Sequence, residues 1–254
     1  VMILRAMGAK VWEEDGYLCT KVDGKLKGAE IKLSLRSTGA TENGILCATL
    51  AVGKTTIWNP HIRPEIIDLV AMLNKMGAKI KVYGQKCIEI IGVDRLDGVT
   101  HESIPDNMEA LTWTIGAAIT GGDIEILDFP FNHLEIPFIQ LRESGLKYYK
   151  GENSLIVKGC EPYPVEISTG PYPGINSDMQ PLFGVFGAIA NGESRIVDLR
   201  FPGRYAYAHE FSKMGVDCKI EGDMLKIFGG KKLVANRVRA LDLRTGIALL
   251  LAGM

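Results

Sequence analysis

The chain has 254 residues, enough for one large domain or two modest ones. Hydrophobic residues make up 46% and charged residues 23%, which is ordinary for a globular protein and argues against disorder. With 29 basic and 30 acidic residues, the net charge of -1 gives no support to a nucleic-acid partner or a membrane-surface role.

The apolar runs, cysteines and histidines of the sequence indicate its compartment and whether it binds a metal. No apolar run of about 18 residues predicts a membrane span, and the N-terminus lacks a signal-peptide pattern. Five dispersed cysteines with no C-x-x-C pair predict reduced thiols in a cytoplasmic protein. The four histidines show no ligand spacing, so we expect no metal site. His61 and His209 are predicted to be surface residues.

A helix-end pattern recurs along the chain. Its first copy is Leu4-Arg-Ala-Met-Gly-Ala-Lys10, and its glycine returns in steps of 69, 68 and 70 residues as Gly8, Gly77, Gly145 and Gly215. A basic last turn followed by Gly predicts a helix end at each copy. Apolar strands are predicted after these ends, at residues 16–22, 86–91, 154–157 and 224–227.

A second, more apolar helix lies between successive copies. These helices are predicted to open at Glu42, Met108, Met179 and Arg244. β-branched runs follow the first three, at residues 55–58, 123–127 and 194–197. The repeating unit is therefore strand-helix-strand-helix-strand-strand, about 69 residues long.

The apolar helices indicate how the units pack. Residues 111–119 and 182–189 are apolar nearly all round, which predicts fully buried helices. A unit of this size cannot cover its own sheet, and its period lies outside those of common solenoids. We therefore predict an α+β fold in which βαβαββ repeats pack around buried helices. Both chain ends fall within a repeat, so we expect the chain to be part of a longer protein.

The turns before the apolar helices differ between copies and are the candidate functional loops. Helix N-termini favour anions, so such turns can surround a phosphorylated ligand. Asp106, Asp178 and Asp242 each precede a helix. Capping is the commoner role for an Asp there, and acting as a general base is the alternative; the two are compatible.

The remaining candidates also have two interpretations. Arg200 and Arg204 lie in a Pro-Gly loop, and Arg244 lies in a helix-opening turn. Each is either a solvated surface charge or a contact to phosphate or carboxylate. Ser37-Thr38-Gly39 is either a plain turn or a loop that binds a nucleotide through backbone groups.

Several of these motifs, in this order, resemble one family. The motifs are Thr38-Gly-Ala-Thr-Glu-Asn43, Arg63-Pro-Glu-Ile-Ile-Asp68, Ile104-Pro-Asp106, Ser177-Asp-Met-Gln180 and Asp242-Leu-Arg244. Together they resemble the enolpyruvyl transferases, in particular the branch that acts on UDP-N-acetylglucosamine. The resemblance covers essentially the whole chain.

The resemblance implies a fold and a reaction. The fold is an inside-out α/β barrel of βαβαββ repeats in two domains. Here they are expected as residues 1–104, a partial UDP-sugar-side domain, and residues 105–254, a second domain lacking its C-terminal end. The reaction moves the enolpyruvyl group of phosphoenolpyruvate to the 3′-hydroxyl of UDP-N-acetylglucosamine and releases phosphate, in peptidoglycan precursor synthesis. No metal or organic cofactor is implied, and we expect a cytoplasmic monomer.

The resemblance also assigns roles. Asp178 is expected to act as the catalytic base on the sugar hydroxyl. The expected substrate-binding residues are Ser37, Thr38, Gly39, Asp106, Arg200, Arg204, Asp242, Leu243 and Arg244. The family's Lys-Asn pair, reactive-cysteine loop and two phosphate-binding arginines match nothing in the chain, so we expect these 254 residues alone to be inactive.

Some substrate-facing positions depart from the family pattern. Asn107 replaces an Arg, Arg200 replaces an apolar residue, and Pro202-Gly203 replaces Glu-Asn. Two alternatives therefore stay open. One is a paralogue with another acceptor, such as 3-phosphoshikimate, and the other is a non-catalytic ligand-binding homologue.

Overall fold

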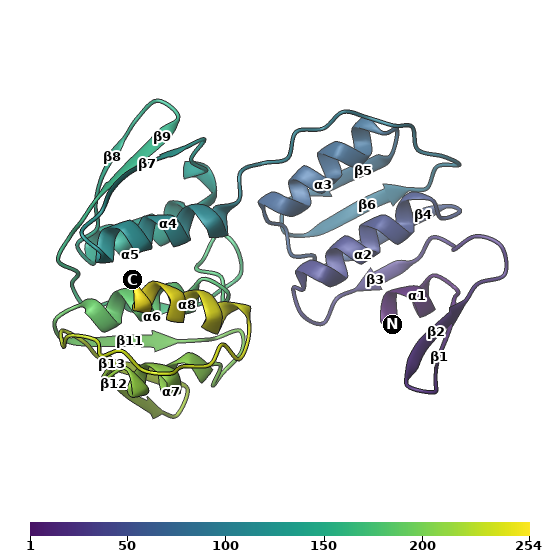
Figure 1. Cartoon of the computed structure of the whole chain (residues 1–254). Helices are drawn as coiled ribbons and strands as arrows, with labels where there is room; N and C mark the ends of the chain where they lie inside the picture. The colour runs from purple at the N-terminus through teal and green to yellow at the C-terminus, as the bar shows by residue number, and fades with distance from the viewer. The chain divides into compact units, whose positions relative to one another are not determined.

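The computed structural model describes all 254 residues. They form two compact units, Val1–Ile104 and Pro105–Met254, each with its own hydrophobic core. Figure 1 shows the helices and strands of both units.

The Val1–Ile104 unit is built on one mixed sheet of order β3-β4-β6-β5. Its strands are β3 (Glu30–Lys32), β4 (Lys54–Trp58), β5 (Lys79–Tyr83) and β6 (Cys87–Ile91). The helices α2 (Thr38–Thr49) and α3 (Pro64–Lys75) pack on each other and against this sheet. A short helix α1 (Met2–Ala6) and the hairpin of β1 (Lys10–Glu14) and β2 (Tyr17–Lys21) precede it.

The Pro105–Met254 unit contains two sheets, of orders β7-β9-β8 and β10-β11-β13-β12. The first has β7 (Asp123–Leu127), β8 (Lys147–Lys150) and β9 (Ser154–Lys158). The second has β10 (Glu166–Ser168), β11 (Glu193–Val197), β12 (Asp217–Glu221) and β13 (Met224–Phe228). The helices are α4 (Asn107–Ile119), α5 (Glu135–Glu143), α6 (Gln180–Ile189), α7 (Ala206–Lys213) and α8 (Leu243–Gly253), with a short 3₁₀ turn η1 (Phe131–His133).

The order of elements confirms the predicted repeat. From β3 to β6 the chain runs strand, helix, strand, helix, strand, strand, and from β10 to β13 it does so again. Between them, α4, β7, α5, β8 and β9 give the same order without the first strand. The four marker glycines, Gly8, Gly77, Gly145 and Gly215, have φ of 93°, 100°, 93° and 90°, as expected for residues just past a helix end.

The register of the parallel strand pairs positions the loops. Ile31 of β3 lies opposite Ile57 of β4, and Ile167 of β10 lies opposite Ile196 of β11. All four side chains are buried, so the register is fixed by the core. Because parallel strands end at the same edge of a sheet, the loops that follow β10 and β11 emerge side by side.

Helix α6 is buried as predicted, but α4 is not fully buried, because its Trp113 is 48% exposed. One helix start was also predicted wrongly. Every residue of α6 from Gln180 to Ala188 is buried, and α4 packs against it. The helix predicted to open at Glu42 in fact begins at Thr38, because Ser37 caps it: the Ser37 Oγ accepts the N–H of Ala40 at 3.3 Å. The sequence pattern missed this because the first turn carries Gly39, whose helix propensity is low.

Candidate active site

In the Pro105–Met254 unit, two loops carry three of the predicted residues. One leads from β10 to α6 and holds Asp178, and the other leads from β11 to α7 and holds Arg200 and Arg204. Since β10 and β11 are parallel neighbours, these loops leave the sheet at the same edge. The two loops therefore contact each other, although the residues that meet are more than twenty positions apart in the sequence.

Asp178 lies between two arginines. The Arg244 Nε lies 2.6 Å from the Asp178 Oδ1, and the Arg204 Nη1 lies 3.6 Å from the same oxygen. The Arg244 contact is a close ion pair that lacks the alignment of a hydrogen bond. About half of the Asp178 side chain, 49%, is exposed. The carboxylate is thus held by two cations while the side chain remains half exposed.

Arg204 is further held by two neighbours. Its guanidinium stacks over the ring of Phe201 with 4.2 Å between the guanidinium carbon and the ring centroid. Its Nη1 donates to the Ser177 Oγ at 3.4 Å. The guanidinium of Arg200, on the same loop, also lies over the Phe201 ring, with 5.6 Å between its carbon and the ring centroid.

Asp106 and Asp242 are helix caps, as the commoner interpretation predicted. The Asp106 Oδ1 accepts the N–H groups of Met108 and Glu109 at the start of α4. The Asp242 Oδ1 accepts the N–H groups of Arg244 and Thr245 at the start of α8, both at 2.9 Å. Burial raises the pKa of Asp242, but these N–H groups and the charges of Arg244 and Arg204 outweigh it and leave the pKa below its usual value.

Asp178 does not cap, so the capping prediction is wrong there. Helix α6 begins two residues later, its N-cap is Met179, and no side chain accepts its first N–H groups. The Asp178 N–H is itself accepted by the Asn176 Oδ1 at 3.0 Å, which turns the chain before the helix starts. The Asp178 carboxylate is therefore free to meet Arg204 and Arg244.

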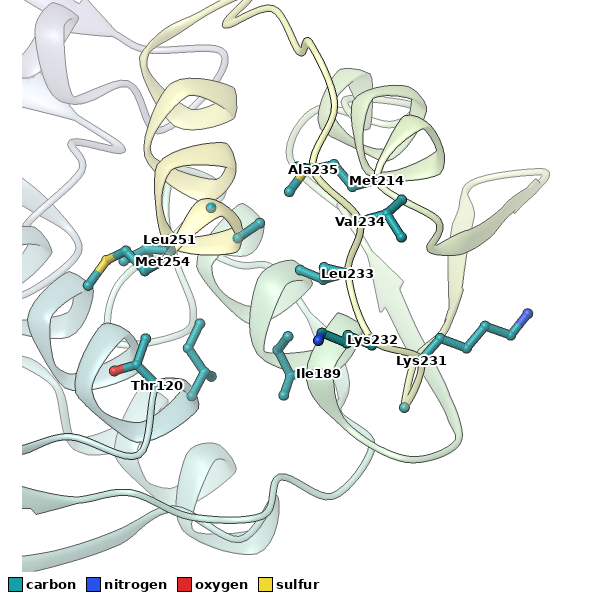
Figure 2. Close-up of a pocket in the computed structure, with 14 residues that line it drawn as sticks. Thr120, Ile189, Met214, Lys231, Lys232, Leu233, Val234, Ala235, Leu251 and Met254 are labelled. Atoms are coloured by element: carbon teal, nitrogen blue, oxygen red, sulfur yellow. The ribbon is translucent and has the colours of Figure 1, made fainter.

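The three apolar helices of this unit run in the same direction. Helices α4 and α8 both pack against α6, and the C-terminal ends of all three line one pocket, with Thr120, Ile189 and Leu251 among its residues (Figure 2). Their N-terminal ends therefore gather at the opposite end of the bundle, where Asp106, Asp178 and Asp242 precede them. Converging helix N-termini attract anions, in keeping with a phosphate ligand.

The pocket of Figure 2, about 600 Å³ in volume, contains none of the predicted site residues. It is lined by the apolar helix ends and by the segment after β13, including Lys231 and Lys232. The chain contains no group of three or more His, Cys, Asp or Glu side chains placed to hold a metal ion. No helix has both the length and the apolar character needed to cross a membrane.

The Ser37-Thr38-Gly39 loop lies in the Val1–Ile104 unit. Ser37 caps α2, and the Thr38 Oγ1 lies 3.0 Å from the His61 Nδ1. The His61 N–H also donates to the buried Thr41 Oγ1 at 3.0 Å. His61 is only partly exposed and supports this loop, a contact that its prediction as a surface residue did not include. A lone histidine gives no sequence signal for such a contact.

The structure joins Asp178, Arg204, Asp242 and Arg244 into one network; Asp242 enters it through the Arg244 Nη1, 3.7 Å away. Asp106 lies outside this network, and Leu243 is 90% exposed at the start of α8. Sequence reasoning missed Asp198, a fully buried carboxylate at the end of β11. The available signal was an acidic residue that follows the apolar pair Ile196-Val197 in a strand.

The comparisons with known proteins fit this architecture. All 254 residues match the profile of the family described as EPSP synthase (3-phosphoshikimate 1-carboxyvinyltransferase). The chain belongs to this family of enolpyruvyl transferases.

Among curated relatives, the chain is similar to the UDP-N-acetylglucosamine 1-carboxyvinyltransferase of Geobacter metallireducens, at 40% identity over 99% of the chain and 60% of that protein. The protein of the same name from Coxiella burnetii is 40% identical over 99% of the chain and 58% of its own length. The chain thus spans about 60% of the length of the relatives it matches. Among solved structures, the enolpyruvyl transferase NikO from Streptomyces tendae has a TM-score of 0.87 at 24% identity, covering 98% of this chain and 62% of that one.

Proposed function

We propose that the protein transfers the enolpyruvyl group of phosphoenolpyruvate to the 3′-hydroxyl of UDP-N-acetylglucosamine and releases inorganic phosphate. The observation that carries the proposal is the geometry of Asp178. Its carboxylate is held by Arg204 and Arg244 through Oδ1, and the side chain is still 49% exposed. The proposal is supported by the names of relatives 40% identical over 99% of the chain.

The proposed roles follow from charge and position. The half-exposed Asp178 carboxylate takes the proton of the acceptor hydroxyl as the hydroxyl oxygen attacks phosphoenolpyruvate. Arg204 and Arg244 carry positive charge beside the same point, where the phosphate must leave. Asp242 holds Arg244 at the start of α8. We propose that Arg200, Leu243 and Asp106 line the substrate site and that the Ser37-Thr38-Gly39 loop binds the nucleotide.

The wider setting is part of the same proposal. The product is a precursor of peptidoglycan, so the enzyme belongs to cell-wall synthesis. We propose a monomer that works in the cytoplasm on small-molecule substrates, without a metal or organic cofactor.

The test uses the protein expressed from its complete gene. Wild type is expected to release one phosphate for each enolpyruvyl group transferred, measured by a coupled phosphate assay and by mass spectrometry of the product. The Asp178→Asn variant keeps the shape of the side chain and loses the base, so turnover should fall by at least about a hundredfold. Asp123→Asn is the matched control, because Asp123 lies on β7 in an exposed ion pair with Lys158. It should retain wild-type turnover, and equal activity in the Asp178 variant would remove Asp178 from the mechanism.

A second candidate is transfer to another acceptor. Arg200 is a partly buried cation in the loop that contacts Asp178, and it stands where the family pattern has an apolar residue. A cation there favours an acceptor with an additional anionic group. Parallel assays with 3-phosphoshikimate and UDP-N-acetylglucosamine distinguish the two acceptors. Binding of both substrates with no phosphate release would instead identify a non-catalytic homologue.

A further inference from the structure

The buried carboxylate of Asp198 receives hydrogen bonds from three separate segments. The Thr169 Oγ1, at the end of β10, donates to the Asp198 Oδ1 at 2.8 Å. The backbone N–H groups of Arg200 and Phe201, in the next loop, donate to the same oxygen at 2.9 Å each. The Ser177 Oγ donates to the Asp198 Oδ2 at 2.5 Å. One fully buried side chain therefore ties both site loops to the sheet.

Asp198 is itself fixed by the core. Its N–H donates to the Tyr205 hydroxyl at 2.8 Å, and that hydroxyl donates to the Asp223 carbonyl at 2.7 Å. Asp198, Thr169 and Ser177 have exposed fractions of 0%, 1% and 4%. Water cannot replace these bonds, so the arrangement has little freedom to change without loss of contacts.

The Ser177 hydroxyl passes this order on to the site. A serine hydroxyl has a single proton, and Ser177 gives it to Asp198. Its oxygen can then only accept, which it does from the Arg204 Nη1 at 3.4 Å. Ser177 is also the residue before Asp178, whose carboxylate meets the same guanidinium. The direction of the Ser177–Asp198 hydrogen bond thus determines that Arg204 faces the Ser177 oxygen as an acceptor and not its proton.

We propose that Asp198 is a positioning residue, which acts through Ser177 to set Arg204 beside Asp178. This positioning role deepens the proposed function, and its expected effect on kcat rests on that function. Asp198 touches no reacting atom in this account. Its role is to orient the Ser177 hydroxyl and to hold the loop that carries Arg204.

The informative variant is Asp198→Asn. The asparagine oxygen would stay with the three donors now on Oδ1, which leaves its NH₂ group facing Ser177. Ser177 would then accept from that group, and its proton would turn toward Arg204 and repel the guanidinium. Thr169→Val is the matched control, because it removes one bond of the same buried cluster without touching Ser177 or the Arg204 loop. Ser177→Ala removes the Ser177–Asp198 hydrogen bond by deleting its donor, and it replaces Asp198→Asn as the test variant if that variant does not fold.

The first measurement needs no activity and uses the 254-residue chain. The Nε–Hε resonance of Arg204 in ¹H–¹⁵N spectra is expected to shift in Asp198→Asn and in Ser177→Ala, and to stay in place in Thr169→Val. Folding is checked by the dispersion of the amide spectrum. An Arg204 resonance that is unmoved in the folded Asn or Ala variant overturns the positioning role, whatever the enzyme assay gives.

The second measurement uses the protein from its complete gene. Misplacement of a charged group by about 1 Å lowers turnover about a hundredfold, so kcat should fall by that order in Asp198→Asn with KM changed much less. Thr169→Val should stay within about twofold of wild type. Because Asp198 acts through Ser177, the variant that combines Asp198→Asn with Ser177→Ala should have a kcat no lower than that of Ser177→Ala alone. Additive losses, or equal losses in Thr169→Val, overturn the proposal; a wild type without enolpyruvyl transfer overturns the proposed function alone.

Discussion

Two neighbouring tyrosines provide a direct test of how the site scaffold is held. Tyr205 and Tyr207 are each 1% exposed, at the start of α7 and directly after the Arg204 loop. The Tyr207 hydroxyl has no hydrogen-bond partner, and its ring lies against Gly184 of α6, where an added Cβ would come within 2.6 Å of it. The Tyr205 hydroxyl, in contrast, joins Asp198 to the Asp223 carbonyl.

The same substitution should therefore have opposite effects at the two positions. A buried hydroxyl without a partner destabilises the fold by about 1–3 kcal/mol. Removing it recovers only part of this free energy, because the missing oxygen atom leaves a small cavity. Tyr207→Phe should accordingly raise the free energy of unfolding by about 1 kcal/mol. Tyr205→Phe should lower it by about 1–3 kcal/mol, because it leaves the buried Asp198 N–H unpaired and removes the donor to the Asp223 carbonyl.

Urea unfolding followed by tryptophan fluorescence measures both changes. Trp113 is the only tryptophan in Pro105–Met254, so replacing Trp12 and Trp58 with Phe makes the signal specific for this unit. In thermal unfolding, each kcal/mol corresponds to about 2–4 °C in a domain of this size. A Tyr207→Phe variant less stable than its parent would refute the reasoning, since the hydroxyl would then have to be making a favourable bond.

Two further predictions concern ionisable groups. Asp242→Ala should lower the stability of the unit by about 1 kcal/mol through loss of the α8 cap, while Asp242→Asn should retain most of the cap. Because the folded-state pKa of Asp242 is lowered, the stability that its charge contributes is present above about pH 4 and is lost as the pH falls below the folded-state value. In urea unfolding, wild type should therefore be more stable than Asp242→Asn at pH 7, and the difference should vanish at pH 2. At the alkaline end, burial raises the pKa of Tyr207 well above its usual value, so the unfolded chain ionises first and stability should fall as the pH rises above about 10. Urea unfolding between pH 9 and 11 should show a shallower fall in Tyr207→Phe; identical slopes would contradict the assigned burial.

The fold was predictable because its signals are local and repeated. Gly77 and its counterparts mark helix ends by a backbone conformation that glycine adopts easily, and an error at one copy is corrected by the others. The residues 123–127 were predicted as a strand and form β7 with the same bounds. The start of α2 was missed because Gly39 weakens the helical pattern, although Ser37 supplies the cap.

The site was less predictable because its decisive contacts join distant residues. From position alone, Asp106, Asp178 and Asp242 have the same pattern, an acid before an apolar helix, and capping is the better prediction for each. What separates Asp178 is Asn176, which accepts the Asp178 N–H and closes the turn two residues before α6, together with the parallel pairing that brings Arg204 to it. The core register thus decides which acid meets Arg204, and no local pattern contains that register. The site of this chain therefore depends on which acid does not cap a helix, more than on which residue types its loops contain.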